Sequence, residues 1–242
     1  MKTGIFKILS NKSIAPSVFK MILEGDVSDV TNCGQFINIK LEQKYLRRPI
    51  SVYDYDDTTV TIIYKVVGEG TEIMSKLCTG DKLDVMTGLG NGYDISKSGD
   101  KPLLIGGGVG VPPMYNLCKK LVSAGKKPTV ILGFNTDAEV FCFDEFAAIC
   151  DVVVTTADGS RGVKGFVTDA MKNIDYTYYY TCGPEPMLKA VHSSAKTSGQ
   201  LSFEERMGCG FGACMGCSCK TKYGNKRICK EGPVLESEEV IW

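Results

Sequence analysis

Four cysteines near the end of the chain have the spacing of an iron–sulfur site. Cys209, Cys214 and Cys217 form a C-x4-C-x2-C pattern, and Cys229 follows after a short charged segment. This is the plant-ferredoxin-type order, in which four thiolates hold the two irons of a [2Fe-2S] cluster. The glycines between the cysteines let the backbone approach a small inorganic core and direct N–H groups at its sulfurs. The sequence therefore predicts a [2Fe-2S] cluster bound by these four cysteines.

A structural zinc ion and a disulfide framework are the two alternative uses of these cysteines. A structural zinc ion also takes four thiolates, but its usual signature has two C-x2-C knuckles and this segment has only one. A disulfide framework is the weaker alternative. Cys219 lies outside the pattern and is interpreted as a small buried side chain. The basic residues of the segment either offset cluster charge or form a solvated surface; they are Arg206, Lys220, Lys222, Lys226, Arg227 and Lys230.

Composition excludes several other classes of protein. Lys and Arg together number 28, as do Asp and Glu, so no basic excess points to nucleic acid. The eleven cysteines, with no apolar core of signal-peptide length after Met1, indicate reduced thiols and a cytoplasmic location. No apolar run approaches the roughly 18 residues of a membrane helix. The single histidine, His192, makes hydrolase triads improbable, and no catalytic acid–base residue is predicted.

Residues 1–98 have the pattern of an antiparallel β-barrel. Short alternating segments such as 35–40 and 58–65 are separated by turn residues, which is typical of a barrel or sandwich. Arg48 precedes Pro49, which favours an extended backbone and leaves the Arg48 guanidinium suited to clamp a phosphate. Gly68-Glu69-Gly70-Thr71 is interpreted as a glycine turn that lets the backbone approach a pyrophosphate.

Residues 99–200 change to alternating strands and helices, which predicts a parallel sheet covered on both faces. The first strand, 102–105, ends in a glycine turn, and Pro112 and Pro113 suit the first turn of a following helix. A second turn follows the last strand of this segment. Ligands bind parallel sheets at such strand ends, so both turns are predicted to bind a dinucleotide. Their residues are Gly106, Gly107, Gly108 and Gly110, and Cys182, Gly183 and Pro184.

Taken in order, these motifs resemble the ferredoxin–NAD(P) reductase superfamily, and the cysteine segment narrows the resemblance to electron-transfer subunits of type B dihydroorotate dehydrogenases. The resemblance implies an α+β multidomain fold with an FAD-binding barrel at 1–98, an NAD-binding α/β domain at 99–200 and a [2Fe-2S] domain at 201–242. The residues expected to contact FAD are Arg48, Pro49, Ile50, Ser51, Ile63, Tyr64, Lys65, Gly70 and Thr71.

The resemblance also implies a function in pyrimidine biosynthesis. Electrons would pass from a partner subunit, an FMN-containing dihydroorotate dehydrogenase, through the cluster and FAD to NAD, in a heterotetramer of two copies of each subunit. Arg161 departs from the expected pattern, because a positive charge near the adenosine ribose favours NADP. Two alternatives remain: a subunit of an NADH-dependent ferredoxin–NADP reductase or hydrogenase, and a ferredoxin-like carrier without a pyridine-nucleotide site.

Overall fold

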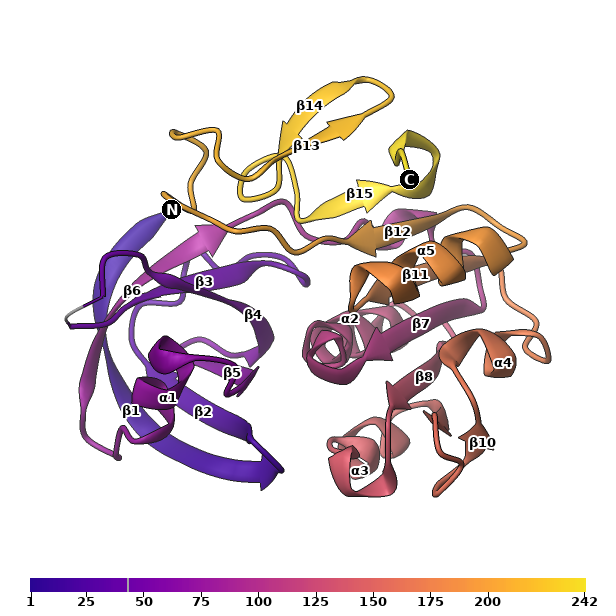
Figure 1. Ribbon diagram of the computed structural model, residues 1–242, viewed down its shortest axis with the longest axis horizontal. Helices are drawn as coiled ribbons and strands as arrows, with labels where there is room; N and C mark the ends of the chain where they lie inside the picture. Colours follow the sequence, from indigo (N-terminus) through magenta and orange to yellow (C-terminus); the bar gives the residue numbers. More distant parts are fainter. Residues whose placement is uncertain (43) are drawn as a thin grey trace.

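A closed six-stranded antiparallel barrel forms the N-terminal part of the computed structural model, which describes residues 1–42 and 44–242 (Figure 1). Side chains alternate across its wall: Ile37 and Ile39 pack inside, whereas Phe36 belongs to a separate apolar cluster outside. The short helix α1 (Glu69–Ser75) follows β5. In barrel order the strands are β1 (Lys2–Ala15), β2 (Val18–Glu24), β5 (Thr59–Lys65), β4 (Arg48–Tyr55), β3 (Phe36–Lys40) and β6 (Lys82–Leu89).

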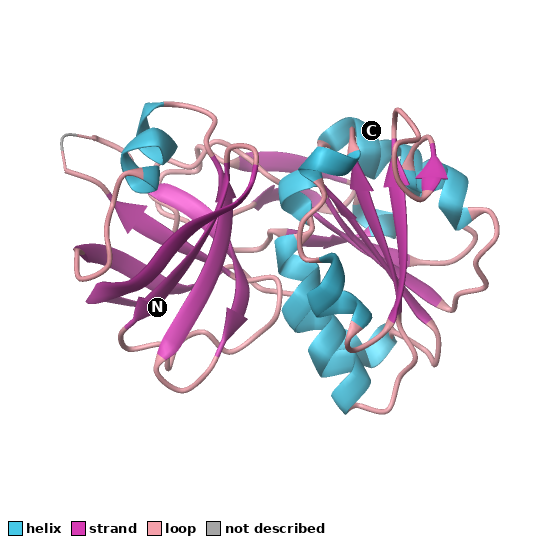
Figure 2. Cartoon of the chain, turned by 90° about the horizontal axis from the view of Figure 1, so that it is seen from below, coloured by secondary structure: helices cyan, strands magenta, loops and turns pink. Residues whose placement is uncertain are grey.

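A mainly parallel sheet forms the second part, which confirms the predicted fold class. Alternate residues of β7 pack on opposite faces: Leu104 contacts the core that includes α2, and Leu103 contacts the core that includes α5. Helices therefore cover both faces of the sheet (Figure 2). The strands in sheet order are β10 (Val163–Lys164), β9 (Asp151–Thr156), β8 (Thr129–Phe134), β7 (Pro102–Gly107), β11 (Tyr178–Cys182), β12 (Gly199–Ser202) and β15 (Val234–Glu236).

The helices follow the strands in the predicted alternation. Helix α2 begins at Pro112, as the proline pair predicts, and a short 3₁₀ turn at Gly108–Gly110 separates it from β7. The helices are α2 (Pro112–Ser123), α3 (Phe143–Ala147), α4 (Val167–Met171) and α5 (Glu185–Ser194), with further 3₁₀ turns at Ile95–Lys97, Asp137–Glu139 and Ser237–Glu239. Among the described residues, no helix has the length and apolar character needed to cross a bilayer.

The C-terminal segment is joined to the sheet. Strand β15 pairs antiparallel with β12, so this segment supplies an edge strand of the parallel sheet. Between these two strands the chain forms the cysteine loop and a hairpin of β13 (Ser218–Thr221) and β14 (Gly224–Arg227). The sheet thus crosses the boundary expected at residues 200 and 201. The cysteine loop lies above the barrel and the hairpin lies above β15 (Figure 1).

Strand β4 of the barrel packs against helix α2 and joins the two larger parts. The Asp54 carboxylate accepts hydrogen bonds from Asn116 Nδ2 at 2.8 Å and from Lys119 Nζ at 2.7 Å. Tyr53 stacks on Tyr115 with ring centroids 4.5 Å apart. A half-buried charge pair together with an aromatic stack holds the barrel at one orientation to the sheet, because both require close approach and alignment.

Candidate functional site

The four predicted cysteines lie together as two neighbouring pairs, three of them in the loop and Cys229 just after the hairpin. The backbone N–H of Cys209 donates to Cys214 Sγ at 3.4 Å, and that of Cys214 donates to Cys209 Sγ at 3.4 Å. The N–H of Cys229 donates to Cys217 Sγ, also at 3.4 Å. The pair Cys209 and Cys214 lies toward solvent, whereas Cys217 and Cys229 are each only 2% exposed. Pairing in twos suits a [2Fe-2S] cluster, since four thiolates share two irons.

Backbone amides make the Cys209 thiol ready to bind metal. Burial opposes ionisation of Cys209, but N–H groups of Cys214, Phe211 and Ala213 outweigh it and lower the pKa of Cys209 to about 6. Burial beside Cys217 raises the pKa of Cys229 to about 12. Ligation by Cys229 therefore needs the positive charge of the metal to displace its proton.

The choice between a cluster and a single zinc ion rests on the spacing of the cysteines, which has one C-x2-C step where zinc sites usually have two. A mononuclear zinc site needs three or four ligands directed at one point. Within residues 1–42 and 44–242, no three Cys, His, Asp or Glu side chains converge in that way. Cys219 lies on β13 opposite Lys226 and packs against the apolar core, and burial raises its pKa. Cys219 is only partly buried, so it falls short of the fully buried side chain that the sequence suggested.

Arg227 holds the cysteine loop through a backbone hydrogen bond and an ion pair. Its Nη1 donates to the backbone carbonyl of Gly212 at 2.5 Å, and its guanidinium pairs with Glu231. Lys230 packs against Gly212, where a Cβ would lie 2.5 Å from its side chain. Lys226 pairs with the buried carboxylate of Glu239. Three of the basic residues seen in the sequence therefore hold the loop and hairpin in place.

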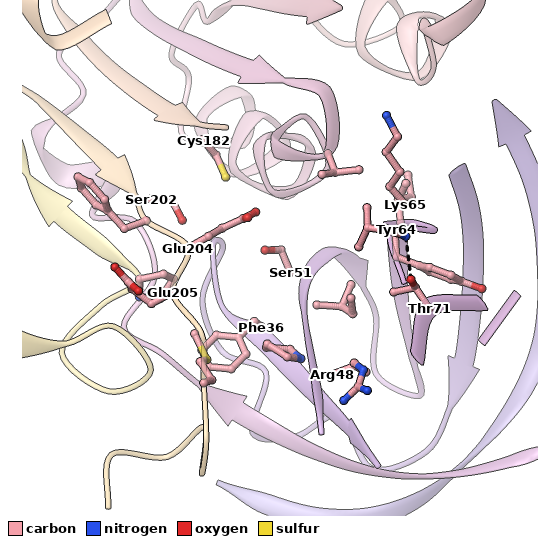
Figure 3. A pocket seen from close by; sticks show the side chains of 18 residues that line it. Phe36, Arg48, Ser51, Tyr64, Lys65, Thr71, Cys182, Ser202, Glu204 and Glu205 are labelled. Atoms are coloured by element: carbon pink, nitrogen blue, oxygen red, sulfur yellow. Dashed lines mark hydrogen bonds between the residues drawn. The ribbon is translucent and has the colours of Figure 1, made fainter. Parts of the chain in front are cut away.

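A cavity of about 340 Å³ lies between the barrel and the parallel sheet (Figure 3). It gathers most residues predicted to contact FAD, although they come from two strands and a helix. Those that line it are Arg48, Pro49, Ile50, Ser51, Ile63, Tyr64, Lys65 and Thr71. A mainly apolar cavity with a few polar groups suits a planar ring system whose edges need hydrogen bonds.

Gly70 makes room for Arg48 at one end of this cavity. A Cβ on Gly70 would lie 2.0 Å from Arg48 Nε and 2.6 Å from its Cζ, so any other residue there would displace the guanidinium. Arg48 Nη1 donates to the carbonyl of Leu46 at 2.5 Å, which orients the planar group. Gly70 therefore contributes through the position of Arg48, and a guanidinium fixed in this way presents its remaining donors to a phosphate.

The segment containing Thr71 is a helix start, whereas the sequence indicated a turn. The Thr71 hydroxyl accepts from the N–H groups of Val67 at 2.9 Å and Gly68 at 3.2 Å, and so caps α1. Tyr64 donates to Asn11 Oδ1 at 3.0 Å, and burial raises its pKa to about 12. Both hydroxyls are already engaged, so these residues shape the cavity wall.

Two polar residues in the cavity, Glu204 and Ser202, were given no role by the sequence alone, whereas Cys182 was predicted to bind the dinucleotide and instead lines this first cavity. Glu204 and Ser202 line it opposite Ser51, and Cys182 lies there as well, so this cysteine faces the barrel side (Figure 3). The surrounding protein raises the pKa of Glu204, although its side chain is exposed through the cavity mouth. Burial and nearby Glu204 raise the pKa of Cys182 to about 12, which keeps it a neutral thiol. The sequence shows the segment Glu204–Met207, but it does not show that the Glu204 side chain faces this cavity.

A second cavity, of about 540 Å³, lies at the carboxyl ends of β7, β8 and β9. Gly107, Gly108 and Pro184 line it, as predicted for the two turns. The other predicted turn residues pack the turns together: a Cβ on Gly106 would lie 2.6 Å from Val111 Cα, and one on Gly110 would lie 2.2 Å from the Cys182 carbonyl oxygen. A Cβ on Gly183 would likewise lie 2.5 Å from Met187 Cε.

Helix α2 offers fewer anion donors than its position suggests. Its first two residues, Pro112 and Pro113, have no backbone N–H, and the N–H of Val111 already bonds to the carbonyl of Gly108. Gly108 has φ +53°, a left-handed conformation that glycine adopts without a Cβ penalty. The turn itself, rather than the helix end, is thus the part shaped to approach a pyrophosphate.

The far end of this cavity carries one acid and one unpaired hydroxyl. Glu139 lines it and accepts from Asn135 N at 3.2 Å and Nδ2 at 3.0 Å. Thr155 lines it too, is 1% exposed, and its hydroxyl has no partner among the described residues. Phe166, 69% exposed, forms an aromatic rim. A ribose and an adenine ring fit these groups as hydrogen-bond and stacking partners.

Arg161, the residue that raised the NADP alternative, is engaged elsewhere. Its Nη1 lies 3.3 Å from Asp137 Oδ1, and its guanidinium lies 4.6 Å from the centre of the Phe143 ring. It does not line the second cavity, whereas Glu139 does. A carboxylate at the cavity and a neutralised arginine outside it both disfavour the extra phosphate of NADP.

The two cavities adjoin. Lys65 and Val109 line both of them, so a ring bound in the first cavity would meet a group bound at the turn of the second. On its other side the first cavity is lined by Met207 and Phe36, which pack in the same apolar cluster as Cys217 and Cys229. Nucleotide turn, barrel cavity and cysteine loop therefore form one continuous series.

Comparisons with known proteins agree with this arrangement. Residues 204–241 match the family model "Iron-sulfur cluster binding domain of dihydroorotate dehydrogenase B", and residues 104–193 match "Oxidoreductase NAD-binding domain". A curated protein of Fusobacterium nucleatum, named "Dihydroorotate dehydrogenase B (NAD(+)), electron transfer subunit", is 43% identical over 99% of both chains. The chain belongs to this family. A protein of the same name from Bacillus pumilus is 42% identical over 99% of this chain and 98% of its own.

Solved structures show the same architecture. A chain from a structure titled as the NADH-dependent reduced ferredoxin-NADP oxidoreductase is 33% identical, with a TM-score of 0.91 over 100% of this chain and 91% of its own. A ferredoxin NADP+ reductase from Neisseria gonorrhoeae shares the fold at 18% identity, with a TM-score of 0.71 over 80% of this chain and 90% of its own. Family membership confirms the predicted oxidoreductase subunit with iron–sulfur and NAD-binding domains.

Replacing Cys214 with serine should abolish the cluster. Serine keeps the shape but supplies no soft thiolate, so iron and acid-labile sulfide per chain should fall to background after anaerobic reconstitution. Cys219→Ser is the matched control in the same segment and should retain both. Full iron and sulfide in Cys214→Ser would contradict the assignment of this loop.

Replacing Arg48 with alanine should weaken FAD binding by about tenfold to a hundredfold, because a charge-assisted hydrogen bond to phosphate contributes about 1.5–3 kcal/mol. The flavin dissociation constant, measured by fluorescence quenching, provides the test. Lys44→Ala, which removes a cation that pairs with Glu69 at the neighbouring helix, serves as control. An unchanged constant in Arg48→Ala would remove Arg48 from the flavin site.

NADH should be the preferred nucleotide. With a dye as acceptor, kcat/KM should be higher for NADH than for NADPH, because Glu139 faces the cavity and Asp137 neutralises Arg161. Arg161→Ala should leave this ratio unchanged. A higher kcat/KM for NADPH that disappears in Arg161→Ala would instead show that Arg161 binds the extra phosphate.

Proposed function

We propose that this chain is the electron-transfer subunit of a dihydroorotate dehydrogenase of type B, which serves pyrimidine biosynthesis. When bound, the [2Fe-2S] cluster supplies one-electron chemistry, and FAD exchanges one electron at a time with it and two with a nicotinamide. The partner is a separate FMN-containing catalytic subunit, in a heterotetramer with two copies of each. The names of the relatives support the assignment, and the residues of this chain bind and align the carriers.

The observation that carries the proposal is the continuity of the three sites. Lys65 and Val109 are shared by the two cavities, and Met207 joins the barrel cavity to the cysteine loop. Met207 and Phe36 belong to the same apolar cluster as Cys217 and Cys229, so the side chains between the cavity and the buried cysteines are mostly apolar. Such an arrangement keeps neighbouring carriers close and their surroundings rigid, which is the work that a protein does for cofactor chemistry.

FAD fits the barrel cavity through the residues that line it. Arg48 would clamp the pyrophosphate, Ser51 would donate to a ring edge, and Ile50 and Ile63 would flank the ring with apolar surface. Glu204 faces the cavity with a raised pKa, so it can exist as a neutral acid that donates a hydrogen bond. Cys182 remains a thiol beside it, since burial raises its pKa.

NAD fits the second cavity with its nicotinamide toward Lys65 and Val109. Gly107 and Gly108 give the pyrophosphate close access to the turn, and the Thr155 hydroxyl finds in the ribose the partner that the protein does not provide. Phe166 would stack on the adenine. Together these residues direct the reactive ring of the nucleotide toward the barrel cavity.

The partner subunit would meet the chain at the cysteine loop. Three large apolar side chains of this segment reach solvent: Phe211 is 41% exposed, Met215 53% and Tyr223 79%. Cys214 is exposed between the first two. Exposed apolar residues next to an outward-facing metal ligand are suited to a protein partner that must approach the cluster closely.

A second candidate is the corresponding subunit of an NADH-dependent ferredoxin–NADP reductase. The solved chain with a TM-score of 0.91 and 33% identity supports it, and its title names flavin-based electron bifurcation. Relatives named as dihydroorotate dehydrogenase subunits have higher identity, 43% and 42%, over nearly the full chain. The identity of the partner distinguishes the two candidates.

We further propose that the protein works in the cytoplasm. All eleven cysteines are free thiols in the structure, and four of them serve the cluster. A reducing compartment preserves thiols of this kind, whereas an oxidising one favours disulfides.

The isolated chain should oxidise NADH with a dye acceptor but should not turn over dihydroorotate. Mixed with an FMN-containing dihydroorotate dehydrogenase subunit from a close relative, it should confer NAD-linked dihydroorotate oxidation and co-elute in a larger complex. Size-exclusion chromatography and absorbance at the NADH band measure both. As a control, Cys214→Ser should keep NADH–dye activity and lose the coupled reaction.

Dihydroorotate-dependent NAD reduction by the chain alone would refute the proposal that a separate subunit oxidises dihydroorotate. Binding to the partner subunit of an NADH-dependent ferredoxin–NADP reductase, but not to the dihydroorotate subunit, would favour the second candidate.

A further inference from the structure

Asn38 occupies an unusual place in the barrel wall. It lies on β3 between Ile37 and Ile39, whose side chains pack inside the barrel. Because side chains alternate along a strand, Asn38 points outward with Phe36, toward the C-terminal segment. That segment covers it completely, since Asn38 is only 1% exposed. A polar side chain has therefore been buried at the junction between the barrel and the cysteine loop.

The neighbour of Asn38 across this junction is Gly210, which directly follows the predicted cluster ligand Cys209. A Cβ on Gly210 would lie 2.2 Å from Asn38 Nδ2, so the carboxamide packs against the bare glycine backbone. Gly210 also has φ +79°, which glycine adopts without strain. The loop thus lacks a side chain at the one point where the barrel places an amide against it.

The carboxamide is underused by the protein itself. Among the described residues, neither side-chain atom of Asn38 forms a hydrogen bond: Oδ1 is buried without a partner, and Nδ2, the donor, lies against Gly210. The hydrogen bond from Arg47 Nη1, at 3.3 Å, goes to the Asn38 backbone carbonyl. Leaving a buried polar atom unsatisfied costs about 1–3 kcal/mol, and a leucine of similar size would avoid that cost. The strand is otherwise apolar at the buried positions, which are Phe36, Ile37 and Ile39.

We propose that Asn38 is a positioning residue of the iron–sulfur site, whose side-chain amide donates a hydrogen bond to a sulfur of the group bound by Cys209 and Cys214. The inference rests on the cluster assignment of the proposed function. Hydrogen bonds to sulfur stabilise the more negative, reduced state and raise the reduction potential. The flavin-binding barrel thereby sets the potential of the carrier beside it through one side chain.

The test is a redox titration of the reconstituted protein, followed by the electron paramagnetic resonance of the reduced cluster. Asn38→Leu keeps the volume and removes the donor, and Asn38→Asp replaces the donor with a carboxylate. We expect the equilibrium constant for one-electron reduction to fall about tenfold in Asn38→Leu, equivalent to about 59 mV. Asn38→Asp should show a fall at least as large, because it adds an acceptor with negative charge.

Thr87→Val is the matched control. Thr87 is also 1% exposed with an unpartnered hydroxyl, but it lies on β6 next to Met86, whose alternation places Thr87 toward the barrel interior. The reduction potential of the cluster in Thr87→Val should equal that of the wild type. A purely structural role for Asn38 would change the melting temperature of the variants and leave the potential unchanged.

Each remaining result is decisive. A wild-type protein that gives no iron–sulfur resonance on reduction would refute the proposed function. A wild-type resonance together with unchanged potentials in both Asn38 variants would refute only the role of Asn38. Loss of iron from both variants, with iron retained in Thr87→Val, would overturn the proposal as well, because it would assign Asn38 to holding the loop.

Discussion

The contact between strand β4 and helix α2 is the constraint on which the rest of the structure depends. Asp54 receives hydrogen bonds from two residues of α2, and Tyr53 stacks on Tyr115 beside them. Strand β4 also carries Arg48 and Ser51, while α2 follows the glycine turn of the nucleotide cavity. Any rotation at this contact would separate the two cavities that share Lys65 and Val109.

The C-terminal segment adds a second constraint by crossing back over both parts. Strand β15 joins the parallel sheet through β12, while the loop before it lies against the barrel at Asn38. Because the loop is attached at the sheet and buried at the barrel, the cysteines have a defined distance from both cavities. The buried pair, Cys217 and Cys229, faces the apolar junction, and the outer pair faces solvent. Under the proposed function, electrons would enter at the outer pair and leave toward the flavin from the buried pair.

Electrostatics follow the same division. At the exposed side, backbone N–H groups lower the pKa of Cys209 and offset the charge of a thiolate. In the barrel cavity, desolvation by the surrounding protein raises the pKa of Glu204 and burial raises that of Cys182, so this region favours neutral groups. A neutral surrounding suits a flavin that changes its charge during turnover, whereas amide donors suit a cluster that is always anionic.

Much of this protein was determined by local sequence. The C-x4-C-x2-C spacing limits which metal the loop can hold, and the change from alternating strands to strand–helix units predicts a barrel followed by a parallel sheet. Pro112 and Pro113 set the start of α2, because proline is tolerated in the first turn of a helix but not in its interior. These features depend on neighbours within a few residues, so they can be read without a structure.

Tertiary structure alone decided which distant residues meet. It tied Thr71 into a helix cap, turned Cys182 toward the barrel cavity, and placed Glu204 opposite Ser51. It also neutralised Arg161 with Asp137 and pressed Asn38 against Gly210. Each of these contacts joins side chains whose direction depends on how strands and helices pack, and packing is a property of the whole chain that no short pattern contains.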